Sequence, residues 1–449
     1  MGFARGPYRP RNGGSPETTA QPNIASFWPE AVTSPDTATR RQTVGGQAPT
    51  AGRWAALAAL AVGLLLAMAT WFSATAVIPQ LRREWGLGPG TQAWLTIAVQ
   101  LGFVAGALIS AMLNLADVFP VRRLMLYGAL GAALANALLA LAPGAVLAIP
   151  LRLVTGAFLA LVYPPALKTM ATWFGTNRGI ALGVLVGALT IGSASPHLVN
   201  AVGGTSWRLV IVATSVLTVA GGLVFVGVYR EGPHPFPHAV FDPRQAFRAL
   251  ASRGLRLAVI GYLGHMWELY AMWAWVSVFF ADVLALHHAA DARRSAAATA
   301  FLVIAIGSLG CVAGGRLGDR WGRTRTTALS MLISGTCAAV IGFLRPASVG
   351  VVLAVALVWG FWVVADSAQF SAMVTELADQ RYVGTAVTTQ LALGFTLTVV
   401  TIWLIPLALT AVSWRLAFLV LVPGPALGLI AMLRLMRLPE ARSIALGRG

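Results

Sequence analysis

Long apolar runs alternate with short polar breaks along most of this chain. Twelve such runs lie at about 54–78, 91–114, 122–142, 146–168, 179–200, 207–229, 256–283, 296–315, 326–344, 348–373, 383–406 and 414–436. About 20 apolar residues in a helix cross the hydrocarbon core of a bilayer. Most runs are apolar on all sides, unlike the striped helices of a soluble protein, and they lack the short alternating segments of a membrane β-barrel. The pattern predicts an all-α integral membrane protein with twelve spans.

The polar segments divide the chain into five parts. Residues 1–53 are rich in Pro, Gly, Ser, Thr and Arg without an apolar run, which predicts a disordered tail and no signal peptide. Six spans at 54–229 and six at 256–438 are joined by a linker at 230–255, and a tail follows at 439–449. The end of the linker is basic and amphipathic, so either a helix on the membrane surface or a solvated linker fits it.

Charge sets the orientation of the spans. The chain is 57% hydrophobic and 10% charged, with a formal net charge of +17, and Lys168 is its only lysine among 32 basic residues. If both termini lie on the same side of the membrane, the segments on that side hold 24 basic residues, and the segments on the opposite side hold 7. Basic residues concentrate in cytoplasmic segments. We therefore expect both termini in the cytoplasm and the protein in the cytoplasmic (inner) membrane, with no nucleic-acid partner.

Several kinds of chemistry find no support in the sequence. Cys311 and Cys337 lie within apolar runs and have no metal-ligand spacing. No phosphate-binding loop of the form GxxxxGK[ST] occurs, which argues against ATP-driven transport. We expect no cofactor, no metal and no enzymatic activity.

The two halves repeat each other. The sequence SWRLV begins the sixth span at Ser206 and SWRLAF begins the twelfth at Ser413. Asp117 follows the second span and Asp319 follows the eighth, at nearly the same offset. Because loop residues as well as apolar runs recur in order, the sequence predicts a duplicated six-helix unit.

One cytoplasmic segment carries a family resemblance. GRLGDRWGRTR, which begins at Gly315, matches Gly-x-Leu-(Ala/Gly)-Asp-Arg-x-Gly-Arg, and RLVTG at Arg152 resembles an Arg-x-x-x-Gly motif. With the twelve spans, these motifs resemble the major facilitator superfamily. The resemblance implies two pseudo-symmetric six-helix bundles that transport solutes by alternating access. It also implies a gating motif, which here comprises Asp117, Arg122, Arg123, Gly315, Asp319, Arg320, Gly322 and Arg323.

The two motif aspartates have expected partners. A carboxylate is stabilised near the positive N-terminal end of a helix. By the pseudo-symmetry of the family, Asp319 faces the start of span five near Gly179, and Asp117 faces the start of span eleven near Arg381. These contacts would hold the halves together on the inside. Alternatively, the arginines of the motif only fix the topology.

Ionisable and aromatic residues within the spans are the candidate site. Charges within a membrane are costly and mark function by default. Span seven places His265, Glu268 and Trp275 at helical spacing, and span ten does the same with Trp362, Asp366 and Gln369. Packing alone also explains such stripes. The remaining candidates for contact with substrate or protons are Arg152, Tyr163, Lys168 and His197.

These residues favour a secondary transporter. The cations among them suggest a small organic or inorganic anion as the solute, moved by alternating access with proton coupling. The alternative is proton-driven efflux of hydrophobic or cationic drugs, which the aromatic stripes and buried carboxylates favour. A polytopic membrane enzyme or a transporter-like sensor is the remote alternative. The expected partners are a small solute, protons and the lipid bilayer, with the protein as a monomer.

Overall fold

A computed structural model describes residues 1–2, 52–174, 178–202, 206–230, 232–233, 252–379 and 382–448. The chain divides into two units, Met1–Ala48 and Pro49–Gly449. Every helix lies in the second unit, and the described residues contain no strand. The predicted tail at 1–53 and linker at 230–255 fall almost entirely outside the described residues.

Each predicted span is one helix or one broken helix. In the first half these are α1 (Arg53–Ala67), η2 (Met68–Thr70), α2 (Ser73–Ala76), α3 (Ile78–Trp85), α4 (Pro89–Met112), α5 (Leu115–Val118), α6 (Val121–Leu139), α7 (Ala145–Leu159), α8 (Tyr163–Ala171), α9 (Arg178–Val202) and α10 (Trp207–Gly227). In the second half they are α12 (Arg253–Leu286), α13 (Ala292–Ala305), α14 (Gly307–Trp321), α15 (Arg323–Ile341), α16 (Val349–Ala365), α17 (Ser367–Leu377), α18 (Val383–Ala411), α19 (Trp414–Ala417), η3 (Phe418–Leu421), α20 (Pro423–Leu435) and η4 (Pro439–Gly447).

Ten helical segments among the described residues are long and apolar enough to cross a membrane. The predicted third and ninth spans, α6 and α15, are not among these ten. Both begin with arginines, at Arg122 and Arg123 in α6 and at Arg323 and Arg325 in α15. These charges lower the mean hydropathy of helices that otherwise match the predicted runs.

Five of the spans are interrupted. The first breaks between α1 and α2, the fourth between α7 and α8, the eighth at Ile306, the tenth at Asp366 and the twelfth between α19 and α20. The break before α8 has a cause in the sequence, because Pro164 and Pro165 cannot continue the hydrogen-bond ladder of α7. A break frees backbone carbonyl groups that must find other partners inside a membrane. The candidate site lies at these interruptions.

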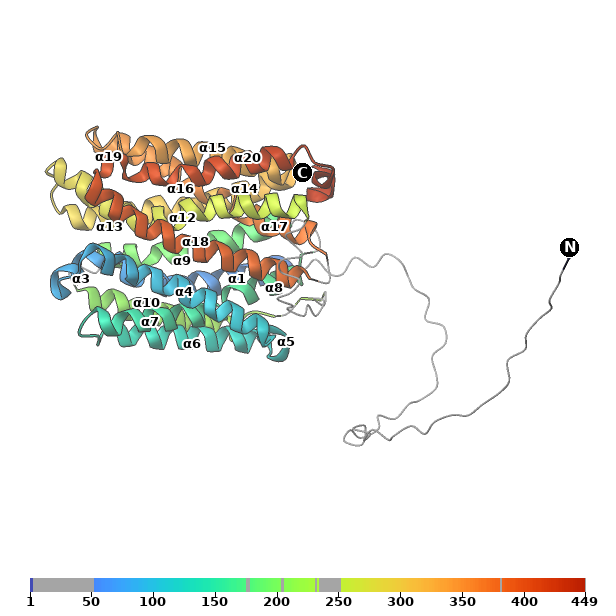
Figure 1. Cartoon of the computed structure of the whole chain (residues 1–449). Coiled ribbons are helices and arrows are strands. Elements are labelled where there is room, and N and C mark those ends of the chain that lie inside the picture. Colours follow the sequence, from blue (N-terminus) through green and yellow to red (C-terminus); the bar gives the residue numbers. More distant parts are fainter. Residues whose placement is uncertain are drawn as a thin grey trace, which may run out of the picture. The chain divides into compact units, whose positions relative to one another are not determined.

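The two halves meet along a few central helices (Figure 1). Helix α9 packs on α13 and α14, and α4 packs on α18. A side chain on Gly315 would meet the backbone carbonyl of Gly179, so α9 and α14 approach closely at these two glycines. Gly322 ends α14 with φ 103°, a left-handed conformation that glycine adopts without strain. Two glycines of the motif thus serve the packing and the turn.

Candidate functional site

An aromatic cluster fills the contact between the two halves. It consists of Trp71, Phe72, Phe103, Tyr270, Trp273 and Phe395. The rings of Phe103 and Phe395 are 4.6 Å apart, and Trp71 lies 5.6 Å from Phe395. Tyr270 joins the same cluster at 5.1 Å from Phe395. Rings at such separations pack favourably beyond the area that they bury. The cluster therefore forms a continuous aromatic wall across both bundles.

Unpartnered polar atoms accompany this wall. Among the described residues, the indole N–H groups of Trp71 and Trp273 are buried without a hydrogen-bond partner. The same holds for both amide atoms of Gln100 on α4 and of Gln390 on α18, and for both ring nitrogens of His197. Native proteins pair nearly all buried polar groups, and exceptions call for an explanation such as a bound ligand or water. The region combines apolar rings with unused donors and acceptors.

His265 and Asp366 form a buried pair in the second half. His265 Nδ1 lies 2.8 Å from Asp366 Oδ1, and both side chains are almost inaccessible. Asp366 is the residue at the break between α16 and α17. The rings of Phe370 and Tyr262 flank the imidazole at 5.6 and 6.1 Å. The two atoms lie at ion-pair distance, although Asp366 Oδ1 has no hydrogen-bond partner among the described residues.

Glu268 follows His265 by one turn of α12 and has different partners. Its carboxylate accepts hydrogen bonds from Trp359 Nε1 at 2.6 Å and from Ser334 Oγ at 2.8 Å. Trp275 donates to the backbone carbonyl of Ile402 on α18 at 3.0 Å. The stripe predicted on span seven therefore does not converge on one point. Helix α12 is buried on most sides, so residues at helical spacing reach different neighbouring helices.

Arg152 is fully buried and satisfies the break in the first span. Its guanidinium donates to the carbonyl of Thr70 at 2.8 Å, to Ser73 Oγ at 3.2 Å and to the carbonyl of Leu95 at 3.3 Å. It also donates to the carbonyl of Trp71. The carbonyls of Thr70 and Trp71 lie where η2 ends, before α2, at the interruption of the first span, and that of Leu95 lies within α4. The contacts give Arg152 a structural task at the first-span break.

Asn136 is a polar hub that sequence reasoning missed. Its amide donates to the carbonyl of Ile211 at 3.1 Å and to Ser215 Oγ at 2.9 Å, and its oxygen accepts from Ser73 at 2.6 Å. An asparagine in the middle of the apolar run of span three was the available signal. Asn136 thus joins the first, third and sixth spans, and Arg152 on α7 adds the second and fourth.

A charge network lies at the inner ends of the helices. We call inner those ends that the count of arginines predicts to be cytoplasmic. Asp319 Oδ2 accepts from the backbone N–H of Ile180 at 3.2 Å, which is the contact with span five that the sequence predicts. Arg323 binds both oxygens of Glu376 at 2.8 to 3.1 Å. Gln369 accepts from Arg323 at 3.0 Å, so it belongs to this network and not to the central cluster. Glu376, on α17, was not anticipated.

The other motif aspartate is engaged within its own half. Asp117 forms an ion pair with Lys168 on α8. Its predicted neighbour Arg381 lies outside the described residues. Arg122 donates to the carbonyl of Tyr229 at 3.5 Å, whereas Arg320 is exposed.

The last two aromatic candidates lie apart from each other. The ring of Tyr163, at the start of α8, is 6.4 Å from that of Phe103 and adjoins the central cluster. Trp362 is only half-buried and packs on Phe361 of its own helix at 5.3 Å. Its neighbour Trp359, one turn earlier, is the tryptophan that reaches a carboxylate.

A family profile accounts for this arrangement. The profile of the Major Facilitator Superfamily matches residues 60–397. The chain belongs to the Major Facilitator Superfamily. A solved bacterial homolog of the human lysosomal transporter Spinster, inward-facing and unoccupied, superposes with a TM-score of 0.63 at 15% identity, covering 89% of this chain and 98% of that one. As a superfamily member, the chain is a multi-pass membrane transporter of small solutes.

Similar curated proteins within the superfamily include drug and antibiotic transporters. Multidrug efflux pump LfrA of Mycolicibacterium smegmatis is 33% identical over 33% of this chain and 29% of the pump. The probable actinorhodin transporter of Streptomyces coelicolor is 26% identical over 57% of this chain and 45% of the relative. The puromycin resistance protein pur8 of Streptomyces alboniger is 31% identical over 34% of this chain and 30% of the relative. The matches thus span less than half the length of these relatives.

Proposed function

We propose that this transporter exports hydrophobic aromatic molecules, including aromatic cations, in exchange for protons. The observation that carries the proposal is the aromatic cluster between the halves, with unpartnered polar atoms on Trp71, Trp273, Gln100 and Gln390. Flat aromatic compounds can stack on such rings, and the free groups can hydrogen-bond to their substituents. The three similar proteins are named for multidrug efflux, actinorhodin transport and puromycin resistance, which favours the export of drugs over that of small anions.

A small anion fits the contacts less well. That hypothesis relied on Arg152 and Lys168, together with His197 and His265. Arg152 is occupied by backbone carbonyls, and Lys168 pairs with Asp117. The names of the relatives do not support an anion either. Aromatic efflux, the alternative that the sequence left open, becomes the leading function.

Alternating access would expose the aromatic cluster to one side at a time. The contact between Asp319 and Ile180 holds α14 to α9 at the inner ends. Opening toward the cytoplasm requires that this contact break, while the aromatic rings of the two halves separate. Both halves reside in one chain, so we expect a monomer to carry out the cycle in the cytoplasmic membrane, with both termini inside.

Two buried carboxylates are the proposed proton carriers. Asp366 faces His265 beside the aromatic rings, and Glu268 is held by two donors deeper in the second half. A buried carboxylate that alternates between a neutral and a charged form can couple proton movement to a change in conformation. We assign the primary role to the His265–Asp366 pair because His265 Nε2 has no partner among the described residues.

A ligand-binding experiment tests the solute class. Purified protein is heated with a panel that contains planar aromatic cations, neutral aromatics and small anions such as nitrate and oxalate. Ligands stabilise the folded state that binds them. We expect the melting temperature to rise with the aromatic compounds only, and less so in Gln100→Ala and Gln390→Ala. A rise with the small anions alone would overturn the proposal.

A further inference from the structure

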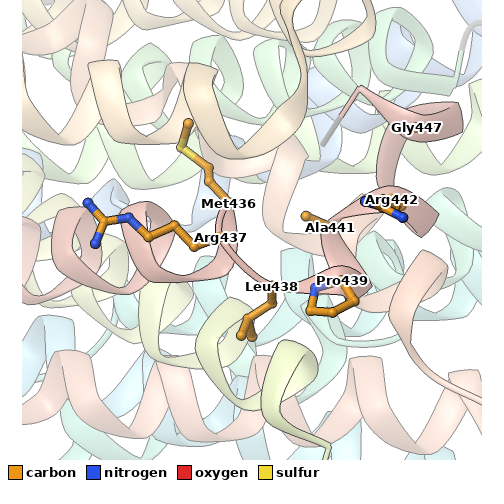
Figure 2. Close-up of a pocket in the computed structure, with 7 residues that line it drawn as sticks. All are labelled: Met436, Arg437, Leu438, Pro439, Ala441, Arg442 and Gly447. Carbon is orange, nitrogen blue, oxygen red and sulfur yellow. The ribbon is translucent and has the colours of Figure 1, made fainter.

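We propose that the inner end of α20 and the segment η4 form a binding site for the phosphate of an anionic lipid headgroup. They enclose a cavity of about 320 Å³ that is lined by Arg437, Arg442 and neighbouring residues (Figure 2). This site is separate from the aromatic cluster, and it goes beyond the proposed export function.

The charges around the cavity favour a phosphate. Residues 434–449 contain four arginines and one acid, Glu440. Arg437 and Arg442 are both exposed, and within the described part of the chain neither guanidinium has a hydrogen-bond or ion-pair partner. Figure 2 shows Arg437 on the helix end and Arg442 on η4, on opposite sides of the turn. Guanidinium groups bind phosphate oxygens in pairs, and these two long side chains can turn toward a phosphate at the cavity.

The position of the cavity identifies a lipid as the source of that phosphate. The last apolar segment is Trp414–Leu435, and the lining of the cavity begins at the next residue, Met436. The site therefore lies at the depth of the headgroups. It is also at the inner ends of the helices, and the cytoplasmic leaflet holds anionic lipids that attract basic segments. A lipid presents its phosphate at this depth in high local concentration, which free phosphate does not.

Occupancy of the site would act on the gating motif through η4. Ala445 donates its backbone N–H to Glu376 at 3.1 Å, and Arg448 donates to the backbone carbonyl of Asp319 at 2.7 Å. Ile444 is fully buried beneath the segment. A headgroup that holds η4 in place would therefore brace Asp319, which contacts α9. Anionic lipid is expected to favour the conformation that is closed on the inside.

The test compares lipids directly on the full-length protein. Purified protein is placed in nanodiscs of phosphatidylcholine alone or with 30% phosphatidylglycerol, and its melting temperature is measured. We expect phosphatidylglycerol to raise it by about 3 °C, and the rise to disappear in 0.5 M NaCl, which screens charge. In the double variant Arg437→Gln/Arg442→Gln at least two thirds of the rise should be lost.

Two controls make the result decisive. Arg434→Gln removes an exposed arginine one turn earlier on α20, outside the cavity lining, and should keep the full rise. Arg437→Lys/Arg442→Lys keeps the charge and should retain about half of it. An equal rise in the Arg→Gln double variant would overturn the proposal. So would an equal rise on adding inorganic phosphate to phosphatidylcholine discs, because the lipid would then not be the ligand.

Discussion

Asp319 on α14 accepts a hydrogen bond from the backbone N–H of Ile180, in the first turn of α9, at 3.2 Å. The two residues belong to different halves, so this contact joins the halves at the inner ends of the helices. The carboxylate lies against the N-terminal end of a long helix, where a negative charge is stabilised. A side chain at Gly179 would meet this carboxylate, which explains the glycine at that position.

Removal of this contact should open the inside. A hydrogen bond to a charged group contributes about 1.5–3 kcal/mol, so Asp319→Ala should raise the population of the inward-open state roughly tenfold or more. The readout is alkylation of a cysteine placed at Ser308, which lies between α14 and α9, in protein without the two native cysteines. Asp282→Asn, which breaks an ion pair with Arg345 in the second half, is the matched control. Equal labelling rates in wild type and Asp319→Ala would contradict the gating role.

Arg152 should matter for folding before it matters for transport. Arg152→Met removes the donor that contacts the carbonyls of Thr70, Trp71 and Leu95, and a buried polar group left without a partner costs about 1–3 kcal/mol. We expect a loss of most folded protein and a strongly lowered melting temperature. Arg152→Lys should recover only part of the stability, because one ammonium group cannot reach all of these acceptors. A stable Arg152→Met protein that fails only to bind solute would show a direct binding role instead.

The hydrogen bond between Trp207 and Glu84 predicts that the stability of the protein depends weakly on pH. Trp207 Nε1 donates to Glu84, which lowers the pKa of this carboxyl below its ordinary 4.5, and Arg208 adds a contact at 2.8 Å. A lowered pKa means that the contribution to stability is complete above pH 4.5 and is lost as the pH falls through the folded pKa. Melting curves between pH 7 and pH 3 should therefore fall less steeply in Glu84→Gln than in wild type. The difference should be small because the Glu84 side chain is 40% exposed and its partner Arg208 is 52% exposed. Parallel curves would show that Glu84 contributes nothing at acid pH.

Sequence patterns predicted the spans and the inner contact for physical reasons. Membrane spanning imposes length and apolarity on each helix, so the runs match the helices within a few residues. Asp319 was predictable because the repeat places it opposite span five. The central contacts were not predictable, because α12 is buried on most sides and its helical spacing does not say which neighbour each residue meets. His265 thus reaches Asp366 while Glu268 reaches Trp359.

Breaks in helices and distant packing explain why the other contacts of the candidate site could not be predicted from the sequence. Whether Arg152 contacts solute or backbone depends on where the first span loses its hydrogen-bond ladder, and residues 68–72 contain no proline to announce the break. The aromatic cluster draws one or two rings each from α4, α12, α18 and the first-span break, so no stretch of sequence displays it. Asn136 and Glu376 gain their partners only through the packing of helices distant in the sequence.

Proton-driven export of aromatic molecules is tested most directly by flux in proteoliposomes. An aromatic cation such as ethidium is followed by fluorescence while a pH difference is imposed across the membrane. Wild type should concentrate the dye on the acidic side. Asp366→Asn should lose this concentration but still exchange dye between the two sides, and Glu84→Gln, an acid substitution far from the centre, should behave as wild type. Dye movement that ignores the pH difference, or that remains fully coupled in Asp366→Asn, would contradict the account.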